Sequence, residues 1–462
     1  MEASMTLLNA HIQFLDTQLA LIHIPLHLYS NFLQPILRLL LPASRPSSAG
    51  SNGSARPRKS WAYEHPFTNI SITPIECSIA CSRELADDLF TSVRDHLDPA
   101  NRDQVSITHE DYIVMQVDGE GLDAGQRVLE LTSPLAMAGI SIFFITTYFS
   151  DYILVPLRAR EQVVKALEDR GFAFEDTTSS YVNPTAAAAA SSHNRSSVSS
   201  FDVPSTPGTP PPTSINELET RTFALLKRRN IVFAVDPSIR LVQCAGSKDT
   251  STGSTATRPL SGSLFLSSNG HHANGANGGE TTAAPRPEDL LHLGLVKSLI
   301  TAPHPTFLSL TLTDTEPASV LLEKRLLHNF SPAVLLGSKE DVLVPITLDL
   351  RDLPLESTGI VCGVAGRLVG GTTSPSLRGC SGVGAGWGAG AASGSAFGGL
   401  ADGVDLLLPD AVEMSYLSTA RAGTVMVAEA ELGRAMEALR GGCDGSSSSS
   451  SSEAGPPGNG FI

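Results

Sequence analysis

The chain has few charged residues, few aromatic residues and no excess of basic ones. Only 17% of its 462 residues are charged and 6% are aromatic, and 32 Lys and Arg face 47 Asp and Glu, which gives a net charge of −15. Nucleic-acid binding needs a basic surface that displaces counterions, so this balance argues against a nucleic acid as the partner. The hydrophobic fraction of 41% permits large cores, and the length allows two to four compact units.

Motifs of the common catalytic and metal sites are missing as well. The sequence contains no GxxxxGK[ST], HExxH or GxSxG, and its 6 cysteines form neither a CxxC pair nor a zinc spacing. We therefore predict no catalysis, no cofactor and no metal. Cys77 and Cys81, four residues apart, leave a metal or redox pair open, but small apolar residues in a strand and at a turn explain them more simply. Free thiols fit a reducing compartment, so we expect a cytoplasmic protein.

Five stretches are built mainly from Ser, Gly, Ala, Pro and Thr. Such compositions bury too little apolar surface to offset the entropy of ordering the backbone. We predict that they are disordered insertions and linkers, at 42–60, 176–215, 245–288, 370–410 and 441–462.

The apolar run 19–41 raises the question of a membrane span, because Arg38 is its only charged residue. Two histidines, an asparagine, a glutamine and two prolines interrupt it, and no positive segment precedes it. The spacing of its apolar residues favours a strand over 18–24 followed by an amphipathic helix over 27–41. We therefore predict no membrane span.

The sequence repeats itself. Ile140–Leu157 aligns with Val412–Glu429 at a constant separation of 272 residues, and apolar positions match throughout. Phe67–Phe90 also resembles Pro305–Phe330 with a gap of two residues. Internal similarity of this kind indicates a duplicated pair of units, in the order A, B, linker, A′, B′.

The second unit shows the pattern most clearly. Apolar strands alternate with two helices, which end at Gly139 and Gly171. The order β-α-β-β-α-β is the ferredoxin-like motif, an α+β fold with two helices on one face of an antiparallel sheet. An unrelated α+β domain is the alternative. The expected elements are strands at 112–118, 140–148, 151–155 and 172–174 and helices at 129–138 and 161–169.

Four such units in two tandem pairs resemble ACT domains, and the chain resembles the CASTOR family of arginine sensors. The segments that carry this resemblance are "ISIFFITTYFSDYILVPL", "LESTGIVCGVAGRL" and "VEMSYLSTARAGTVMV". Members of that family are cytosolic and act on the TOR complex through the GATOR assembly. The resemblance implies ACT-like units at 7–98, 104–175, 216–336 and 340–440, a linker at 176–215 and a tail at 441–462.

The resemblance also implies an amino-acid site at the seam of the second and fourth units. A zwitterion needs backbone N–H groups for its carboxylate and an acceptor for its ammonium group. Glu356 is a candidate acceptor, although a solvated loop carboxylate explains it equally well, and Ser357 and Thr358 could simply cap a helix. Gly359 would let a ligand approach the backbone closely. The predicted ligand-binding residues are Ile140, Ser141, Ile142, Glu356, Ser357, Thr358, Gly359, Ile360, Ser418 and Thr419.

One position departs from the arginine-binding pattern. Family members that bind arginine have an acidic residue in the β-turn of the fourth unit, and the aligned residue here is Gly423. A buried guanidinium without a carboxylate is strongly disfavoured, which argues against arginine as the ligand. An acid stands at the matching place of the second unit, Asp151, where it either serves a pseudo-symmetric site or finishes a strand turn; we favour the turn.

These observations predict a non-catalytic amino-acid sensor or adaptor in TOR-type nutrient signalling. Its expected partners are an amino acid, bound as a small molecule, and a protein assembly such as a GATOR-like complex, and self-association into a homodimer is left open. Two other functions fit the same residues: a scaffold with a degenerate pocket, and a regulatory ACT subunit of an amino-acid biosynthetic enzyme.

Overall fold

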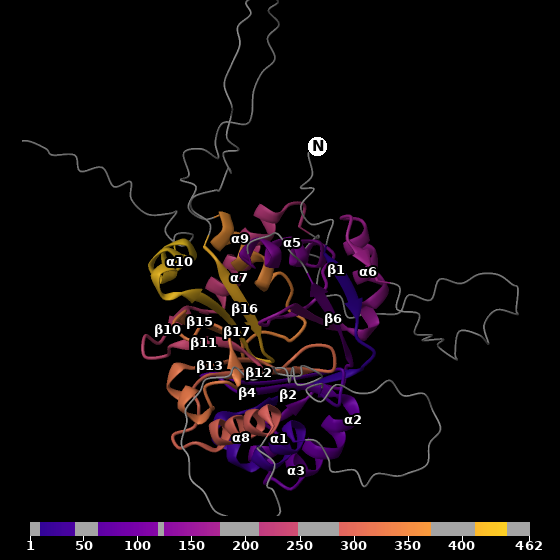
Figure 1. Cartoon of the computed structure of the whole chain (residues 1–462). Helices are drawn as coiled ribbons and strands as arrows, with labels where there is room; N and C mark the ends of the chain where they lie inside the picture. Colours follow the sequence, from indigo (N-terminus) through magenta and orange to yellow (C-terminus); the bar gives the residue numbers. More distant parts are fainter. Residues whose placement is uncertain are drawn as a thin grey trace, which may run out of the picture.

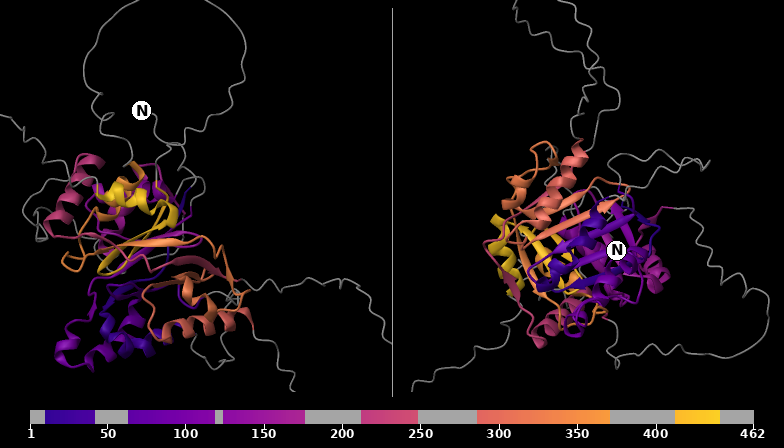
Figure 2. Two further views of the ribbon diagram at one scale, coloured as in Figure 1. Left: turned by 90° about the vertical axis from the view of Figure 1, so that its left-hand side faces the viewer. Right: turned by 90° about the horizontal axis from the view of Figure 1, so that it is seen from below.

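Four layers make up the structure: helices, a sheet, a second sheet and further helices. The computed structural model describes residues 10–41, 63–118, 124–175, 212–247, 286–370 and 412–440. Two sheets are stacked in the middle, and helices cover the outer face of each (Figures 1 and 2). The predicted insertions lie outside the described residues over 42–60, 176–211, 248–285, 371–410 and 441–462.

The sheet that lies above in Figure 1, here the upper sheet, draws strands from both halves of the chain. Its neighbouring strands are antiparallel except for β1 and β9, which are parallel. Across the described residues the strand order is β9 (Ala173–Phe174), β1 (His11–Phe14), β6 (Tyr112–Asp118), β8 (Asp151–Pro156), β7 (Phe143–Thr146), β16 (Met414–Ser418), β17 (Ala422–Ala428), β15 (Leu343–Asp349) and β10 (Phe233–Val235).

The lower sheet has the same mixed origin, and its neighbouring strands are antiparallel. Its order over the described residues is β5 (Ser106–Ile107), β2 (Leu19–Ile24), β4 (Cys77–Ser82), β3 (Phe67–Ile72), β12 (Leu308–Thr313), β13 (Ser319–Glu323), β11 (Leu241–Gly246) and β14 (Leu335–Leu336).

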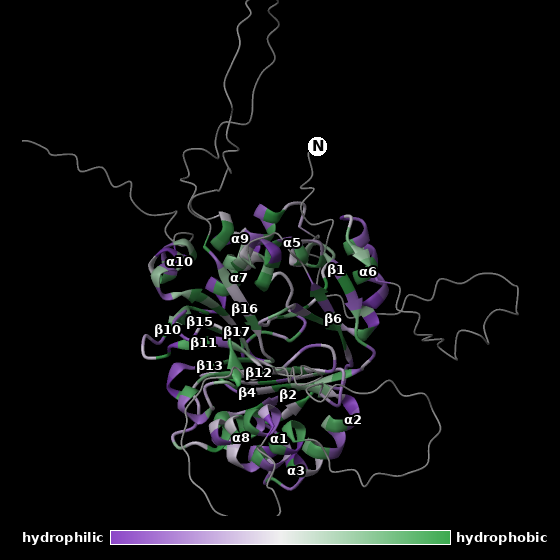
Figure 3. Ribbon diagram, viewed as in Figure 1, coloured by the Kyte–Doolittle hydropathy of each residue, from purple (hydrophilic) through white to green (hydrophobic). Residues whose placement is uncertain are grey.

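Helices close both outer faces. Above lie α5 (Ala124–Met137), α6 (Arg160–Glu168), α7 (Ile215–Arg228), α9 (Ile360–Gly370) and α10 (Leu432–Arg440). Below lie α1 (Leu33–Leu40), α2 (Arg83–Leu85), α3 (Ser92–Asp95) and α8 (Pro287–Ile300), and the short α4 (Pro99–Arg102) follows α3 in the chain. Helices such as α6 and α10 combine apolar and polar residues (Figure 3), as expected where one face packs on a sheet.

Three large hydrophobic cores hold the layers together in the described part of the chain. One lies between the upper helices and their sheet and includes Phe144 and Val364, and a second lies between the lower helices and their sheet and includes Phe32. The third lies between the two sheets, where the rings of Phe67 and Tyr152 are 5.1 Å apart. Alternate residues of one strand therefore serve different cores, as the period of two in a strand requires.

At its centre each sheet pairs corresponding strands of the two halves. Ile145 of β7 pairs with Leu417 of β16, and these residues are 272 positions apart, the separation found in the repeated sequence. Ile70 of β3 pairs with Leu310 of β12 in the same antiparallel manner. Antiparallel pairing of corresponding residues places a local two-fold axis between the strands.

Several local predictions are confirmed. The strand predicted over 112–118 is β6, and Gly139 and Gly171, with φ of +70° and +90°, follow the ends of α5 and α6. The run 19–41 forms β2, a 3₁₀ segment (Leu26–Phe32) and α1. Within the described ranges, we find no helix with the length and hydrophobicity needed to cross a bilayer.

Other boundaries differ from the prediction. Helix α5 begins at Ala124 rather than at 129. Strand β7 is shorter than 140–148 because the Ile140 N–H donates to the carbonyl of Leu135 at the end of α5 and the Thr147 N–H donates to that of Ser150 in a turn. Helix α7, which begins within the predicted linker, and strand β10 were not predicted at all.

Candidate functional site

A cavity of about 50 Å³ lies where the second and fourth predicted units meet. Its walls come from the end of α5 and the start of β7, from the loop into α9, and from β16 and the turn into β17. Seven of the ten predicted ligand-binding residues line it: Ile140, Ile142, Ser357, Gly359, Ile360, Ser418 and Thr419. These residues come from three segments that are far apart in the sequence, and the fold brings them together.

Ser141, Glu356 and Thr358 are not among the lining residues. The side chain of Glu356 is 67% exposed and lies 3.3 Å from the guanidinium of Arg158, so it is a surface ion-pair partner and not an acceptor inside the cavity. Ser141 is buried beside the wall without facing the cavity.

Gly359 has a specific structural reason to be glycine. Its φ is +82°, and a Cβ atom at this position would lie 2.8 Å from Cδ1 of Leu218 on α7. The hydroxyl of Thr222, also on α7, donates to its carbonyl at 3.2 Å, and the Gly363 N–H donates to the same carbonyl at 2.8 Å. The close approach that the sequence suggested for a ligand is thus made by helix α7, which positions the start of α9.

The floor of the cavity is the β16–β17 turn, Thr419–Ala422. The Thr419 N–H donates to the Ala422 carbonyl at 2.9 Å. Beside it, the Phe144 N–H donates to the Ser418 hydroxyl at 3.0 Å, which ties β16 to β7. The two predicted units therefore share the floor.

Gly423 does not lie in that turn but in strand β17, where it pairs with Leu348 and Ser418. A Cβ atom here would be 2.6 Å from the hydroxyl oxygen of Tyr416, which lines the cavity. Tyr416 thus fills the place where an acidic side chain at 423 would lie. Replacing Gly423 by Asp must first displace this ring, so it is a poorer probe of arginine binding than the sequence suggested.

The corresponding position of the second unit is occupied by an ion pair. Asp151, at the start of β8, is buried, and its Oδ2 lies 2.5 Å from Nε of Arg127 on α5. Burial raises the pKa of the Asp151 carboxyl, and the Arg127 guanidinium lowers it in part. Asp151 therefore does not only end a turn, because its ion pair with Arg127 also fixes the start of α5 to the sheet.

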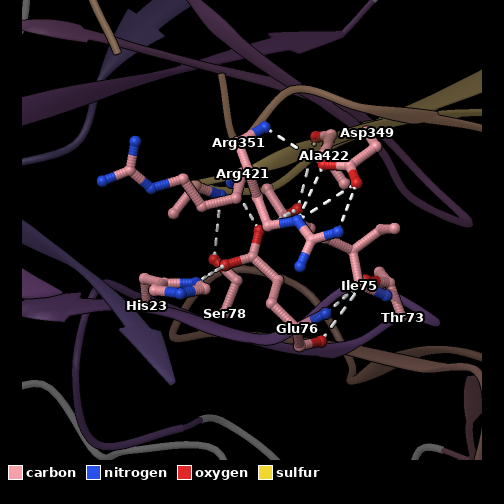
Figure 4. Close-up of polar contacts among 11 residues, drawn as sticks. His23, Thr73, Ile75, Glu76, Ser78, Asp349, Arg351, Arg421 and Ala422 are labelled. Carbon is pink, nitrogen blue, oxygen red and sulfur yellow. Dashed lines mark hydrogen bonds and ion pairs between the residues drawn. The ribbon is translucent and has the colours of Figure 1, made fainter. Parts of the chain in front are cut away.

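One functional candidate, Glu76, was missed by the sequence reasoning. It follows β3 in the lower layer, and its side chain is fully buried beneath the cavity floor (Figure 4). The Thr419 hydroxyl donates to Glu76 Oε1 at 2.6 Å, and the Arg421 N–H donates to the same oxygen at 2.5 Å. A recurring T-x-x-E pattern, Thr73–Glu76 and Thr313–Glu316, is the signal that could have found it.

The cavity combines hydroxyl groups with apolar side chains, and none of the described residues that line it is acidic. Cys362 lines it too, but burial raises the pKa of its thiol, which keeps the sulfur neutral. Cys77 and Cys81 are buried free thiols of β4, consistent with the simpler of their two interpretations. Nowhere in the described part of the chain do three or more His, Cys, Asp or Glu gather as metal ligands.

Comparison with known proteins finds similar solved structures of low sequence identity. No curated protein matches the sequence significantly. Among solved structures, a protein of Agobacterium tumefaciens is similar over 36% of this chain and 91% of its own, at 20% identity and a TM-score of 0.22. Aspartate kinase from Synechocystis is similar over 97% of this chain and 58% of its own, at 10% identity and a TM-score of 0.27. The regulatory subunit of aspartate kinase from Thermus thermophilus is similar over 34% of this chain and 95% of its own, at 10% identity and a TM-score of 0.21.

A family model for the ACT domain matches residues 107–169. This segment contains β6, α5, β7, β8 and α6, and so supplies one wall of the cavity. The part of the chain from 107 to 169 is therefore an ACT domain.

Proposed function

We propose that the protein is a non-catalytic amino-acid sensor or adaptor built from four ACT-like units in two tandem pairs. ACT domains generally bind amino acids in regulatory roles, and one such domain forms a wall of the cavity. The observation that carries the proposal is the convergence of three distant segments on one cavity at the seam. The pairing of residues 272 positions apart at the centre of the upper sheet supports the duplication.

In this proposal the ligand joins the two halves of the upper layer, and the joined state is read by a protein partner. Such a switch requires that the ligand bind one state more tightly than the other. The resemblance to the CASTOR family makes a GATOR-like complex in TOR signalling, in the cytoplasm, the first partner to test. The absence of an acidic side chain among the described lining residues favours a ligand other than arginine.

A thermal-shift screen of the full chain against each of the twenty amino acids tests the proposal. A ligand of the folded state stabilises it by about 2.7 kcal/mol at a hundred times its Kd, which is a clear rise in Tm. Ser357→Phe fills the cavity from the loop before α9 and should abolish the rise. Thr358→Phe adds the same ring one residue away, outside the lining, and serves as the matched control.

A scaffold with a degenerate pocket is the second candidate, favoured by the small volume of about 50 Å³. A flat response to all twenty amino acids would refute the sensor and leave the scaffold. Co-purification with an amino-acid biosynthetic enzyme would instead favour a regulatory subunit.

A further inference from the structure

The cavity floor is anchored from the opposite layer of the molecule. Glu76 receives the Thr419 hydroxyl and the Arg421 N–H on Oε1, and His23 Nδ1 lies 2.5 Å from its Oε2. Close by, the Ser78 hydroxyl of β4 accepts from the Ala420 N–H at 3.1 Å. Figure 4 shows the Glu76 side chain reaching from the lower layer toward the Arg421 backbone. Two side chains of the lower layer thus take up hydrogen bonds from three consecutive residues of the floor.

A related arrangement, in which the carboxylate accepts side-chain groups rather than a backbone N–H, occurs a second time. Glu316, which follows β12, receives the hydroxyl of Tyr152 on Oε2 at 2.9 Å and the hydroxyl of Ser150 on Oε1. The Ser319 hydroxyl accepts from the Tyr148 N–H at 2.9 Å, as Ser78 accepts from Ala420. Glu316 therefore holds the turn Thr147–Ser150 of the second unit, which corresponds to the cavity floor.

The two copies differ in one respect that matters for function. Thr419, Ala420 and Ala422 line the cavity, whereas none of residues 147–150 does. The chain therefore contains an internal control: Glu316 binds the corresponding turn, and that turn does not line the cavity.

We propose that Glu76 is a positioning residue for the cavity, and that together with Ser78 it couples the cavity floor to the lower layer. The proposal rests on the proposed function only where it concerns the ligand. A fully buried carboxylate is stable only while it is hydrogen-bonded, so Glu76 fixes the floor turn in one place. A guest that displaces the floor must then also shift Glu76, and a partner that moves the lower layer must shift the floor, because coupling is reciprocal.

The Glu76 carboxylate also makes one side of the cavity more favourable for a positive charge than the other. Glu76 lies directly behind the Thr419 hydroxyl, and the first residues of α9 also line the cavity. The first N–H groups of a helix have no partner within the helix itself. A zwitterion is bound best with its ammonium group toward the floor and its carboxylate toward the helix start. The site is thus suited to an α-amino acid rather than to a simple anion.

Hydrogen exchange on the full chain tests the coupling without any ligand. Glu76→Met keeps the length of the side chain and removes both strong acceptors. Exchange in the peptide that contains Ala420 and Arg421 should rise about tenfold or more, while the peptide that contains Tyr148 and Ser150 should change less than about twofold. Glu316→Met should reverse this pattern.

Ser78→Ala and Ser319→Ala are a second matched pair, with a much smaller change of volume in case Glu76→Met does not fold. They should raise exchange at Ala420 and at Tyr148, respectively. Unchanged exchange of the floor in Glu76→Met and Ser78→Ala, or an equal effect of all four variants on both turns, would overturn the proposal.

The ligand is tested separately. For any amino acid that raises the Tm in the screen, calorimetry should show a Kd weakened about tenfold by Glu76→Met and unchanged by Glu316→Met, the loss expected for one charged hydrogen-bond acceptor. Equal weakening by both variants would refute the positioning role. If no amino acid binds, the proposed function fails, while the exchange pattern still decides whether Glu76 positions the floor.

Discussion

The contact between Gly423 and Tyr416 gives the sharpest quantitative prediction. Glycine is the only residue that leaves the Tyr416 hydroxyl in place, because a Cβ atom at 423 would lie 2.6 Å from that oxygen. Gly423→Ala should therefore destabilise the protein. Forcing an extra methyl group into a packed site costs about 1–3 kcal/mol.

Removing the hydroxyl should remove this cost. In Tyr416→Phe, the nearest remaining atom to the new methyl group is the ring carbon Cζ at 3.5 Å, an ordinary van der Waals contact. Replacing glycine by alanine at an unstrained position then gains about 0.4–1 kcal/mol, since the unfolded chain loses freedom. The Gly423→Ala/Tyr416→Phe pair should thus show a favourable coupling of about 1–3 kcal/mol.

Urea unfolding of the wild type, both single variants and the double variant measures this coupling. Equal m-values in all four proteins show that the same unfolding transition is compared. Additive effects, with a coupling below about 0.5 kcal/mol, would refute the packing described for this corner of the cavity. If the double variant bound an amino acid that the wild type does not bind, this would show in addition that Tyr416 limits the volume of the cavity.

Two further predictions concern the walls of the seam. Gly359→Ala should lower the free energy of unfolding by about 1–3 kcal/mol, because a φ of +82° is strained for any side chain and the new Cβ would lie 2.8 Å from Leu218. Urea unfolding measures this loss, and an unchanged stability would contradict the prediction. Asp151→Asn tests the buried pair with Arg127. Burial raises the pKa of the Asp151 carboxyl in the folded state, so its contribution to stability is largest below its usual pKa of 3.8 and is lost as the pH rises through the raised value. The free energy of unfolding of Asp151→Asn should therefore increase relative to that of the wild type as the pH rises over this interval. Urea unfolding of both proteins at several pH values measures this difference, and a decrease with rising pH would contradict the prediction.

Local patterns predicted the elements well where strong side-chain periodicity and a glycine stop coincide. The apolar run Tyr112–Asp118 and the stop at Gly139 are such cases, and both agree with the structure. Helix α7 was missed because it directly follows a stretch of low complexity. Its start nevertheless carries a capping box, in which the Ser214 hydroxyl accepts from the Glu217 N–H at 3.2 Å.

The seam could be predicted in outline but not in its chemistry. The repeat placed Ile140 and Ser418 in corresponding segments, and the fold brings both to one cavity. Whether a loop carboxylate such as Glu356 points inward depends on a partner far away in sequence, here Arg158. Glu76 lies outside the segments that carry the resemblance, so only the contact between the layers reveals its part.

The central pairing of Ile145 with Leu417 has an evolutionary consequence. In an assembly of two identical chains, every substitution would appear on both sides of such an axis at once. When both halves belong to one polypeptide, each side mutates alone, so the second unit can hold Asp151 with Arg127 while the fourth holds Gly423 with Tyr416 at the corresponding place. Each half can therefore change its side of the central pairing without the same change appearing in the other half.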